Sequence, residues 1–198
     1  VVVAFHGHGG SGTEFARVLK PTIATLPLVA LACPDGRAIK EGRKLRRGWA
    51  YRGPDLFDRK QSVDEDEISV TQLIDTHLNN FSKIILIGYS QGGAVVASMS
   101  YLKAHDSKIA GFGIVSSGAT PEIITAHSSL LSPPEQTPVF YRCGSIDERV
   151  PLTSVERTIA ILNSDRAVVN AQIMQGVNHT QGMKRALPAL KLWLGSII

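Results

Sequence analysis

The sequence predicts an α/β fold, in which a mostly parallel sheet of about six or more strands is covered by helices on both faces. Short apolar runs recur along the chain, and most are continuously apolar rather than alternating, as expected for parallel strands buried on both sides. Segments with helical periodicity lie between these runs. No internal repeat and no linker rich in glycine, proline or serine divides the chain, so we expect residues 1–198 to form one domain.

The predicted strands are the runs richest in apolar and β-branched residues. In chain order they are residues 1–5, 28–33, 84–87, 109–115, 138–143 and 168–174. None of them approaches the ~18 consecutive apolar residues that a membrane-spanning helix needs. We therefore expect no stable membrane insertion.

Helices are predicted between the strands. The first begins near Ser11, because Ser11 and Glu14 have the spacing of a capping box and apolar residues at helical spacing follow. We expect Pro188 to kink or interrupt the last helix, since proline removes a backbone hydrogen bond. The helices after the first are predicted at residues 68–78, 93–104, 153–162 and 181–194.

Residues 88–92 read Gly-Tyr-Ser-Gln-Gly and match G-x-S-x-G, the pattern of a nucleophile elbow. In an elbow, a sharp turn from strand to helix projects a serine hydroxyl above the sheet. The bare pattern is weak, since a random chain of this composition would contain it about one time in seven. Here a predicted strand precedes it and a predicted helix follows it, so we predict that Ser90 is a catalytic nucleophile.

A serine hydroxyl needs a general base, and the base needs an acid that holds its tautomer. Of the three histidines after Ser90, only His179 follows the last predicted strand, where we expect it to begin a loop before the final helix. Asp147 follows the predicted strand that ends at Cys143, so its carboxylate would lie at the same sheet edge as Ser90. We therefore predict His179 as the base and Asp147 as the acid, and we expect Glu148 to face elsewhere.

Acyl transfer also needs donors for an oxyanion. One is the backbone N–H of Gln91, directly after the nucleophile, and we expect the second from the glycine-rich loop at residues 6–12, at the backbone N–H of His8. No cysteine or acid joins His6 and His8 locally, so we predict that they order the loop rather than bind a metal. The loop also lacks the motifs of phosphate and dinucleotide sites. We predict no metal and no cofactor.

Four motifs spread over nearly the whole chain carry a resemblance to a known family. They are His6-Gly7-x-Gly9, Gly88-Tyr89-Ser90-Gln91-Gly92-Gly93, Gly144-x-x-Asp147-x-x-Val150-Pro151 and Gly176-x-x-His179. This set resembles the phospholipase/carboxylesterase family of α/β-hydrolases, which includes acyl-protein thioesterases and small bacterial carboxylesterases. The resemblance implies an α/β-hydrolase fold and hydrolysis of carboxylic esters or thioesters without a cofactor. Members usually have additional strands before the His-Gly loop, so we expect this chain either to be truncated at its N-terminus or to be a minimal member.

Residues 35–67 form the longest predicted connection, and connections of this length are usually functional or mobile. Between Arg37 and Arg52, Glu41 is the one acid, and the basic residues are Arg37, Lys40, Arg43, Lys44, Arg46, Arg47 and Arg52. The segment is either a lid, in which Trp49 and Tyr51 contact the substrate and arginines attract an anionic substrate or lipid head group, or a solvated loop anchored by Trp49. The resemblance favours a substrate-binding Trp49. No recognised nucleic-acid-binding module is present, so we expect no nucleic acid partner.

The resemblance also bears on the two cysteines, Cys33 and Cys143. In an α/β-hydrolase sheet their strands would lie about four places apart, roughly 19 Å, whereas a disulfide needs Cα atoms within about 7 Å. We therefore predict two free thiols. Free thiols favour a cytoplasmic location.

Together these residues predict a serine hydrolase that cleaves a small-molecule or lipid-like ester or thioester through an acyl-enzyme intermediate, as a monomer or homodimer. An alternative of a different class is a catalytically silent binding protein of the same fold. A lactone hydrolase or a serine peptidase of this fold is a further alternative. The lactone hydrolases normally carry cysteine in place of Ser90, and the peptidases usually bring an extra domain.

Overall fold

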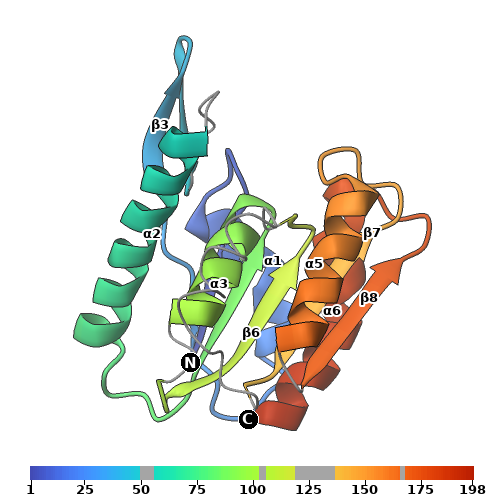
Figure 1. Cartoon of the computed structure of the whole chain (residues 1–198). Helices are drawn as coiled ribbons and strands as arrows, with labels where there is room; N and C mark the ends of the chain where they lie inside the picture. The colour runs from blue at the N-terminus through green and yellow to red at the C-terminus, as the bar shows by residue number, and fades with distance from the viewer. Residues whose placement is uncertain (50–55, 103–105, 119–136, 166–167) are drawn as a thin grey trace.

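The computed structural model describes residues 1–49, 56–102, 106–118, 137–165 and 168–198 (Figure 1). Within these residues, six strands form one sheet in the order β2-β1-β5-β6-β7-β8, and every neighbouring pair is parallel. The strands are β1 (Val2–Phe5), β2 (Leu31–Ala32), β5 (Ile84–Tyr89), β6 (Ile109–Val115), β7 (Val139–Gly144) and β8 (Val169–Met174). The predicted parallel sheet is confirmed.

Helices cover both faces of this sheet (Figure 1). They are α1 (Gly12–Ile23), α2 (Leu56–His77), α3 (Gln91–Leu102), α5 (Leu152–Asp165) and α6 (His179–Ile197). Helices α1 and α6 share one apolar core with the sheet, to which Phe15 and Trp193 belong. Helices α2, α3 and α5 share a second core on the opposite face, which contains Ile74, Val95 and Leu162. This layered arrangement is the predicted α/β fold.

Strand β5 shows why the apolar runs are continuous. Ile84 and Leu86 pack in the core beneath α2, α3 and α5, whereas Ile85 and Ile87 pack in the core beneath α1 and α6. All four side chains are at most 2% exposed. Burying each one contributes about 1.5–3 kcal/mol, so both faces of the strand favour apolar residues.

The predicted elements before residue 35 agree with the structure in part. The predicted strand at residues 28–33 is reduced to Leu31–Ala32, because Leu28 has a φ of 58°, which lies outside the extended region. Ser11 is the N-cap of α1 as predicted, and its hydroxyl accepts the N–H of Glu14 at 3.3 Å.

Helix α6 runs through Pro188 without a break, so of the two expected effects, a kink or an interruption, the interruption does not occur. Pro188 and Lys184 lie on the exposed side of the helix. The carbonyl of Lys184 has no N–H partner at Pro188. At an exposed position water can take the place of that partner, which keeps the cost of the missing hydrogen bond small.

Residues 35–67 contain regular structure that the predicted long connection did not include. Strands β3 (Arg37–Glu41) and β4 (Lys44–Gly48) form an antiparallel hairpin, here called the basic hairpin. Its turn includes Gly42 with a φ of 59°, a conformation that glycine adopts without strain. Helix α2 already begins at Leu56.

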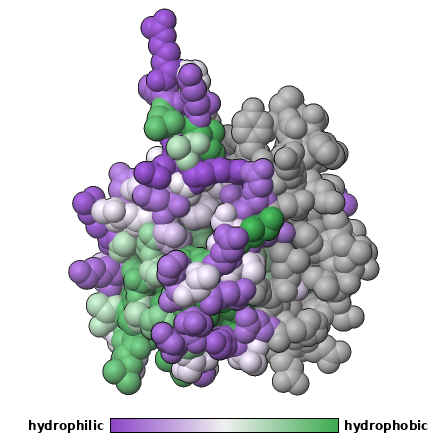
Figure 2. All heavy atoms as spheres, turned by 90° about the vertical axis from the view of Figure 1, so that its left-hand side faces the viewer, coloured by the Kyte–Doolittle hydropathy of each residue, from purple (hydrophilic) through white to green (hydrophobic). Residues whose placement is uncertain are grey.

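Figure 2 shows the basic hairpin as a largely hydrophilic projection from the body of the protein. Its strands contain few apolar residues, and Ile39 and Leu45 lie on opposite faces of the hairpin. No apolar period therefore marked these strands in the sequence. Tyr51 and Arg52, which belong to the predicted lid segment, lie outside the described residues. No helix in the described ranges is long and apolar enough to cross a membrane.

Cys33 and Cys143 are free thiols, as predicted. Cys33 directly follows β2 and Cys143 lies in β7, four places away in the sheet order. Burial raises the pKa of Cys33 to about 11, and burial together with the carboxylate of Asp147 raises that of Cys143 to about 12. Both thiols are therefore protonated at neutral pH.

Candidate active site

The carboxyl ends of the parallel strands bring the predicted site residues to one edge of the sheet. Ser90 directly follows β5, Asp147 follows β7, and His179 follows β8. The loop with His8 follows β1, the strand beside β5. In open α/β sheets this edge is where ligands bind.

Ser90 occupies a strained turn between β5 and α3. Its φ is 54°, in the left-handed region that non-glycine residues rarely adopt. The turn also requires its two flanking glycines. A methyl group on Gly88 would lie 2.1 Å from the carbonyl oxygen of Gly92, and one on Gly92 would lie 2.3 Å from that of Phe5. These close approaches are those of a nucleophile elbow.

The structure brings Ser90, His179 and Asp147 into one chain of contacts. Nε2 of His179 lies 2.9 Å from Oγ of Ser90, and Nδ1 lies 2.9 Å from both carboxylate oxygens of Asp147. His179 and Asp147 are buried, whereas Ser90 is partly exposed. The hydroxyl is therefore open to a substrate while the acid and the imidazole are shielded from water.

Asp147 is held by its own loop. Oδ1 accepts the N–H groups of Arg149 and Val150, each at 2.9 Å, and Sγ of Cys143 lies 3.7 Å from Oδ2. These contacts fix the carboxylate in the orientation that meets His179. The loop thus serves as a rigid support for the imidazole.

His179 is the first residue of α6, so the expectation that it begins a loop is wrong. Asn178 caps this helix in a capping box with Gln181. The spacing of these two residues is visible in the sequence and is the signal that would have placed the helix start correctly. The rigid helix terminus restricts the position of the imidazole.

Two further side chains hold the backbone of His179. The hydroxyl of Tyr89 donates to its carbonyl at 2.8 Å, and the carboxylate of Glu148 accepts its N–H at 3.2 Å. The expectation that Glu148 faces elsewhere is therefore wrong. Hydrogen bonds from its own N–H and from that of His179 lower the pKa of Glu148. Burial, with Asp147 nearby, raises the pKa of Tyr89 to about 12, so Tyr89 is a protonated donor.

The loop after β1 is ordered by His6. Nε2 of His6 accepts the N–H of Gly36 at 2.9 Å, so the proton is on Nδ1, which donates to the carbonyl of Gly7 at 2.7 Å. The N–H groups of Gly9 and Gly10 are engaged by backbone carbonyls at 2.8 and 3.1 Å. Neither amide is available to a substrate, and the amide of His8 stays the predicted donor. No cluster of metal-binding side chains occurs among the described residues.

Trp49 bonds to one predicted oxyanion residue, Gln91, and to His6 in the loop that carries the other. Its backbone N–H donates to Oε1 of Gln91 at 3.1 Å, and its indole N–H donates to the carbonyl of His6 at 2.9 Å. The indole is 5% exposed and packs edge-on against Phe5, with ring centroids 5.1 Å apart. A direct contact of Trp49 with substrate stays a prediction.

Arg37 is a residue of this region that the sequence did not single out, since it resembles its basic neighbours. Its guanidinium donates to the carbonyl of Trp49 at 2.9 and 2.7 Å and pairs with Glu65 and Asp66 of α2. Burial raises the pKa of Asp66 to about 8, although Arg37 opposes this shift. Through these contacts, Arg37 connects Trp49 to α2.

A family model supports the assignment that this geometry suggests. The model of the phospholipase/carboxylesterase family matches residues 1–194. The chain belongs to the phospholipase/carboxylesterase family. The resemblance carried by the four sequence motifs is confirmed.

Solved structures show the same fold. SOBER1 from Arabidopsis thaliana has a TM-score of 0.78 and 20% identity, over 98% of this chain and 97% of that one. A Bacillus cereus carboxylesterase has a TM-score of 0.75 and 15% identity, over 100% and 88% of the two chains. Zea mays acyl-protein thioesterase 2 has a TM-score of 0.68 and 20% identity, over 98% and 93%. A comparison with curated protein sequences finds no match.

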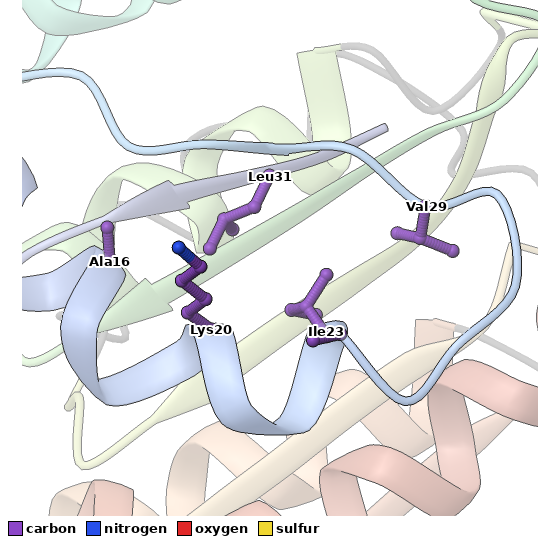
Figure 3. A pocket seen from close by; sticks show the side chains of 6 residues that line it. Ala16, Lys20, Ile23, Val29 and Leu31 are labelled. Atoms are coloured by element: carbon purple, nitrogen blue, oxygen red, sulfur yellow. The ribbon is translucent and has the colours of Figure 1, made fainter.

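Of two cavities among the described residues, one lies beside the predicted site and the other lies away from it. One of about 180 Å³ lies beside the His8 loop, with apolar walls from Phe15, Val18 and Tyr89. The other, of about 390 Å³, lies between α1 and the edge of the sheet at β2, and its lining includes Lys20 and Leu31 (Figure 3). Only the first shares residues with the predicted site.

Proposed function

We propose that this family member is a serine hydrolase that cleaves carboxylic esters or thioesters, with Ser90 as nucleophile, His179 as base and Asp147 as acid. The observation that carries the proposal is the relay of 2.9 Å contacts from Ser90 through His179 to Asp147. Similarity in fold to a carboxylesterase and an acyl-protein thioesterase supports the choice of substrate class.

In the first half-reaction, Asp147 accepts the Nδ1–H of His179, so Nε2 is the nitrogen that takes the proton of Ser90. Oγ bonds to the carbonyl carbon, and the carbonyl oxygen becomes an oxyanion held by the amides of His8 and Gln91. Loss of one such donor costs about 3 kcal/mol of transition-state stabilisation. The imidazolium then gives its proton to the departing alcohol or thiol, and an acyl-enzyme remains.

In the second half-reaction, a water molecule replaces the leaving group. His179 removes one proton from the water as its oxygen bonds to the acyl carbon, and the carboxylic acid departs as Ser90 regains its proton. The sum is ester plus water giving acid plus alcohol. Apart from the substrate and water, each step uses only side chains and amides of this chain.

Replacement of the nucleophile tests the proposal. Ser90→Ala should lower kcat on a short-chain aryl ester by about 10⁴-fold or more, because no other group here can form the acyl-enzyme. The matched control is Ser164→Ala, since Ser164 is an exposed serine at the end of α5. A Ser90→Ala protein that keeps most of its activity would rule out the scheme.

A further inference from the structure

The basic hairpin brings positive charge close to the predicted oxyanion loop. Residues 37–48 contain one acid, Glu41, and six basic residues, Arg37, Lys40, Arg43, Lys44, Arg46 and Arg47. Figure 2 shows this hairpin as a hydrophilic projection. Charge of this density attracts anions. The position of each basic side chain determines whether an attracted anion would lie near the predicted site.

The register of the hairpin places Arg46 on the face that meets the active site. Residues opposite each other share a face, so Arg46 lies on the same face as Ile39, its partner, and as Gly48, two residues further on. Gly48 packs against both predicted oxyanion residues. A methyl group there would lie 2.6 Å from Oε1 of Gln91 and 3.4 Å from Nδ1 of His8.

The Arg46 side chain lies over the oxyanion loop itself. A methyl group on Gly9, the residue after His8, would lie 3.0 Å from Nη1 of Arg46. The backbone of the hairpin is bonded there as well, since the N–H of Gly9 donates to the carbonyl of Arg47 at 2.8 Å. Arg46 therefore lies beside the loop whose amide would bind the substrate carbonyl.

The other two arginines of the strands are directed elsewhere. Arg37 donates to the carbonyl of Trp49, and Arg47 pairs with Asp35 at 3.4 Å and donates to the carbonyl of Gly36. Among the arginines of β3 and β4, Arg46 is the one whose guanidinium lies against Gly9.

The sheet order indicates which part of a substrate faces Arg46. Ser90 follows β5, the His8 loop follows β1 on one side, and His179 follows β8 on the other side. The leaving group takes its proton from His179 and so lies toward β8. The acyl group would therefore lie on the other side of Ser90, toward β1 and the basic hairpin.

We propose that Arg46 makes this enzyme selective for esters or thioesters whose acyl group carries an anionic substituent, such as the free carboxylate of a dicarboxylic acid monoester. This inference rests on the proposed function, because it concerns the substrate of the same site. A guanidinium binds a carboxylate through two parallel hydrogen bonds as well as charge. Since Arg46 is exposed, its contribution is a factor of about three to ten in kcat/KM.

The experiment compares two aryl esters of equal acyl length, 4-nitrophenyl hexanoate and the 4-nitrophenyl monoester of adipic acid. The measured quantity is the ratio of kcat/KM for the anionic ester to that for the neutral one, each corrected for spontaneous hydrolysis. Arg46→Gln should lower this ratio about three- to tenfold, and Arg46→Lys should restore part of it. The control is Arg43→Gln, which removes the same charge at the hairpin turn and should leave the ratio within about twofold.

Each outcome decides something different. An unchanged ratio in Arg46→Gln, with both esters hydrolysed, overturns the inference and leaves the proposed function standing. Equal losses in Arg43→Gln and Arg46→Gln overturn it too, because they assign the effect to diffuse charge. A further measurement is cosedimentation of the wild-type chain with phosphatidylserine vesicles. If Arg46→Gln and Arg43→Gln both weaken that binding and leave the ratio unchanged, the charge serves a lipid surface, and the inference is overturned. Hydrolysis of neither ester by the wild-type chain overturns the proposed function as well.

Discussion

Tyr89 illustrates how single side chains determine the geometry of the site. It is the variable residue before Ser90 in the elbow motif, and its hydroxyl reaches across to the carbonyl of His179 at 2.8 Å. Its ring lies against the imidazole, with centroids 5.4 Å apart. The residue next to Ser90, the predicted nucleophile, therefore holds the carbonyl of His179, the predicted base, while Glu148 accepts the N–H of His179.

Tyr89→Phe removes the hydroxyl and keeps the ring. We expect kcat on an aryl ester to fall about three- to tenfold with KM unchanged, because one hydrogen bond of about 1 kcal/mol no longer restrains His179. Steady-state kinetics measure this, and a denaturant midpoint checks that the fold is kept. A wild-type kcat in a folded variant would show that the contact does not position the base.

At the scale of elements, the basic hairpin supports the loop that carries His8, the predicted oxyanion loop. Its end residue Gly48 packs against His8 and Gln91, and the next residue, Trp49, bonds to Gln91 and to the carbonyl of His6. These contacts give Trp49 a positioning role, whereas the family resemblance favoured a substrate contact. The two roles predict different kinetics.

Trp49→Phe removes the indole N–H that holds the carbonyl of His6. A positioning role predicts that kcat falls about three- to tenfold while KM changes little, since the loop loses a restraint of about 1 kcal/mol. Trp193→Phe is the control, because Trp193 of α6 is a similarly buried tryptophan that packs against Phe140 of β7. A raised KM with an unchanged kcat would instead indicate direct contact with substrate.

The junction of α2 and the hairpin predicts a pH dependence of stability. The pKa of Asp66 is raised to about 8 by burial, far above its usual value near 4, so the folded state binds this proton more tightly than the unfolded state. The stability from the protonated form is therefore present at pH 4 and is lost as the pH rises toward about 8.

Asp66→Asn keeps the shape of the protonated acid at every pH. We expect the variant to match the wild type near pH 4 and to be more stable by about 1–3 kcal/mol near pH 9, where wild-type Asp66 is a buried charge. Urea denaturation at several pH values measures the difference. A difference that is constant with pH, or that favours the wild type at high pH, would contradict the raised pKa.

At the scale of the whole molecule, the layers and the site were predictable for different reasons. Strands such as β5 are buried on both faces, and a continuous apolar run in the sequence predicts such burial. The grouping of Ser90, Asp147 and His179 was predictable because parallel strands end at one edge and the motif order follows the strand order. Both signals are local in sequence.

The contacts that the sequence did not reveal depend on tertiary structure. Arg37 is one of six basic residues in its segment, and only the fold places it against Trp49 and α2. Glu148 reaches the N–H of His179 because the loop after β7 meets the start of α6 at the sheet edge. The basic hairpin has no apolar face, so its strands carry no periodic signal.

The most direct test of the central claim, that Ser90 is a nucleophile activated by His179, is covalent labelling with a fluorophosphonate. The reagent reacts with a serine only where a base removes its proton, so it also separates an enzyme from a silent binding protein. We expect one phosphonyl group per chain in the intact mass, located on Ser90 by peptide mapping and absent in Ser90→Ala. An unlabelled wild-type protein, or a label on another serine with Ser90 unmodified, would contradict the account.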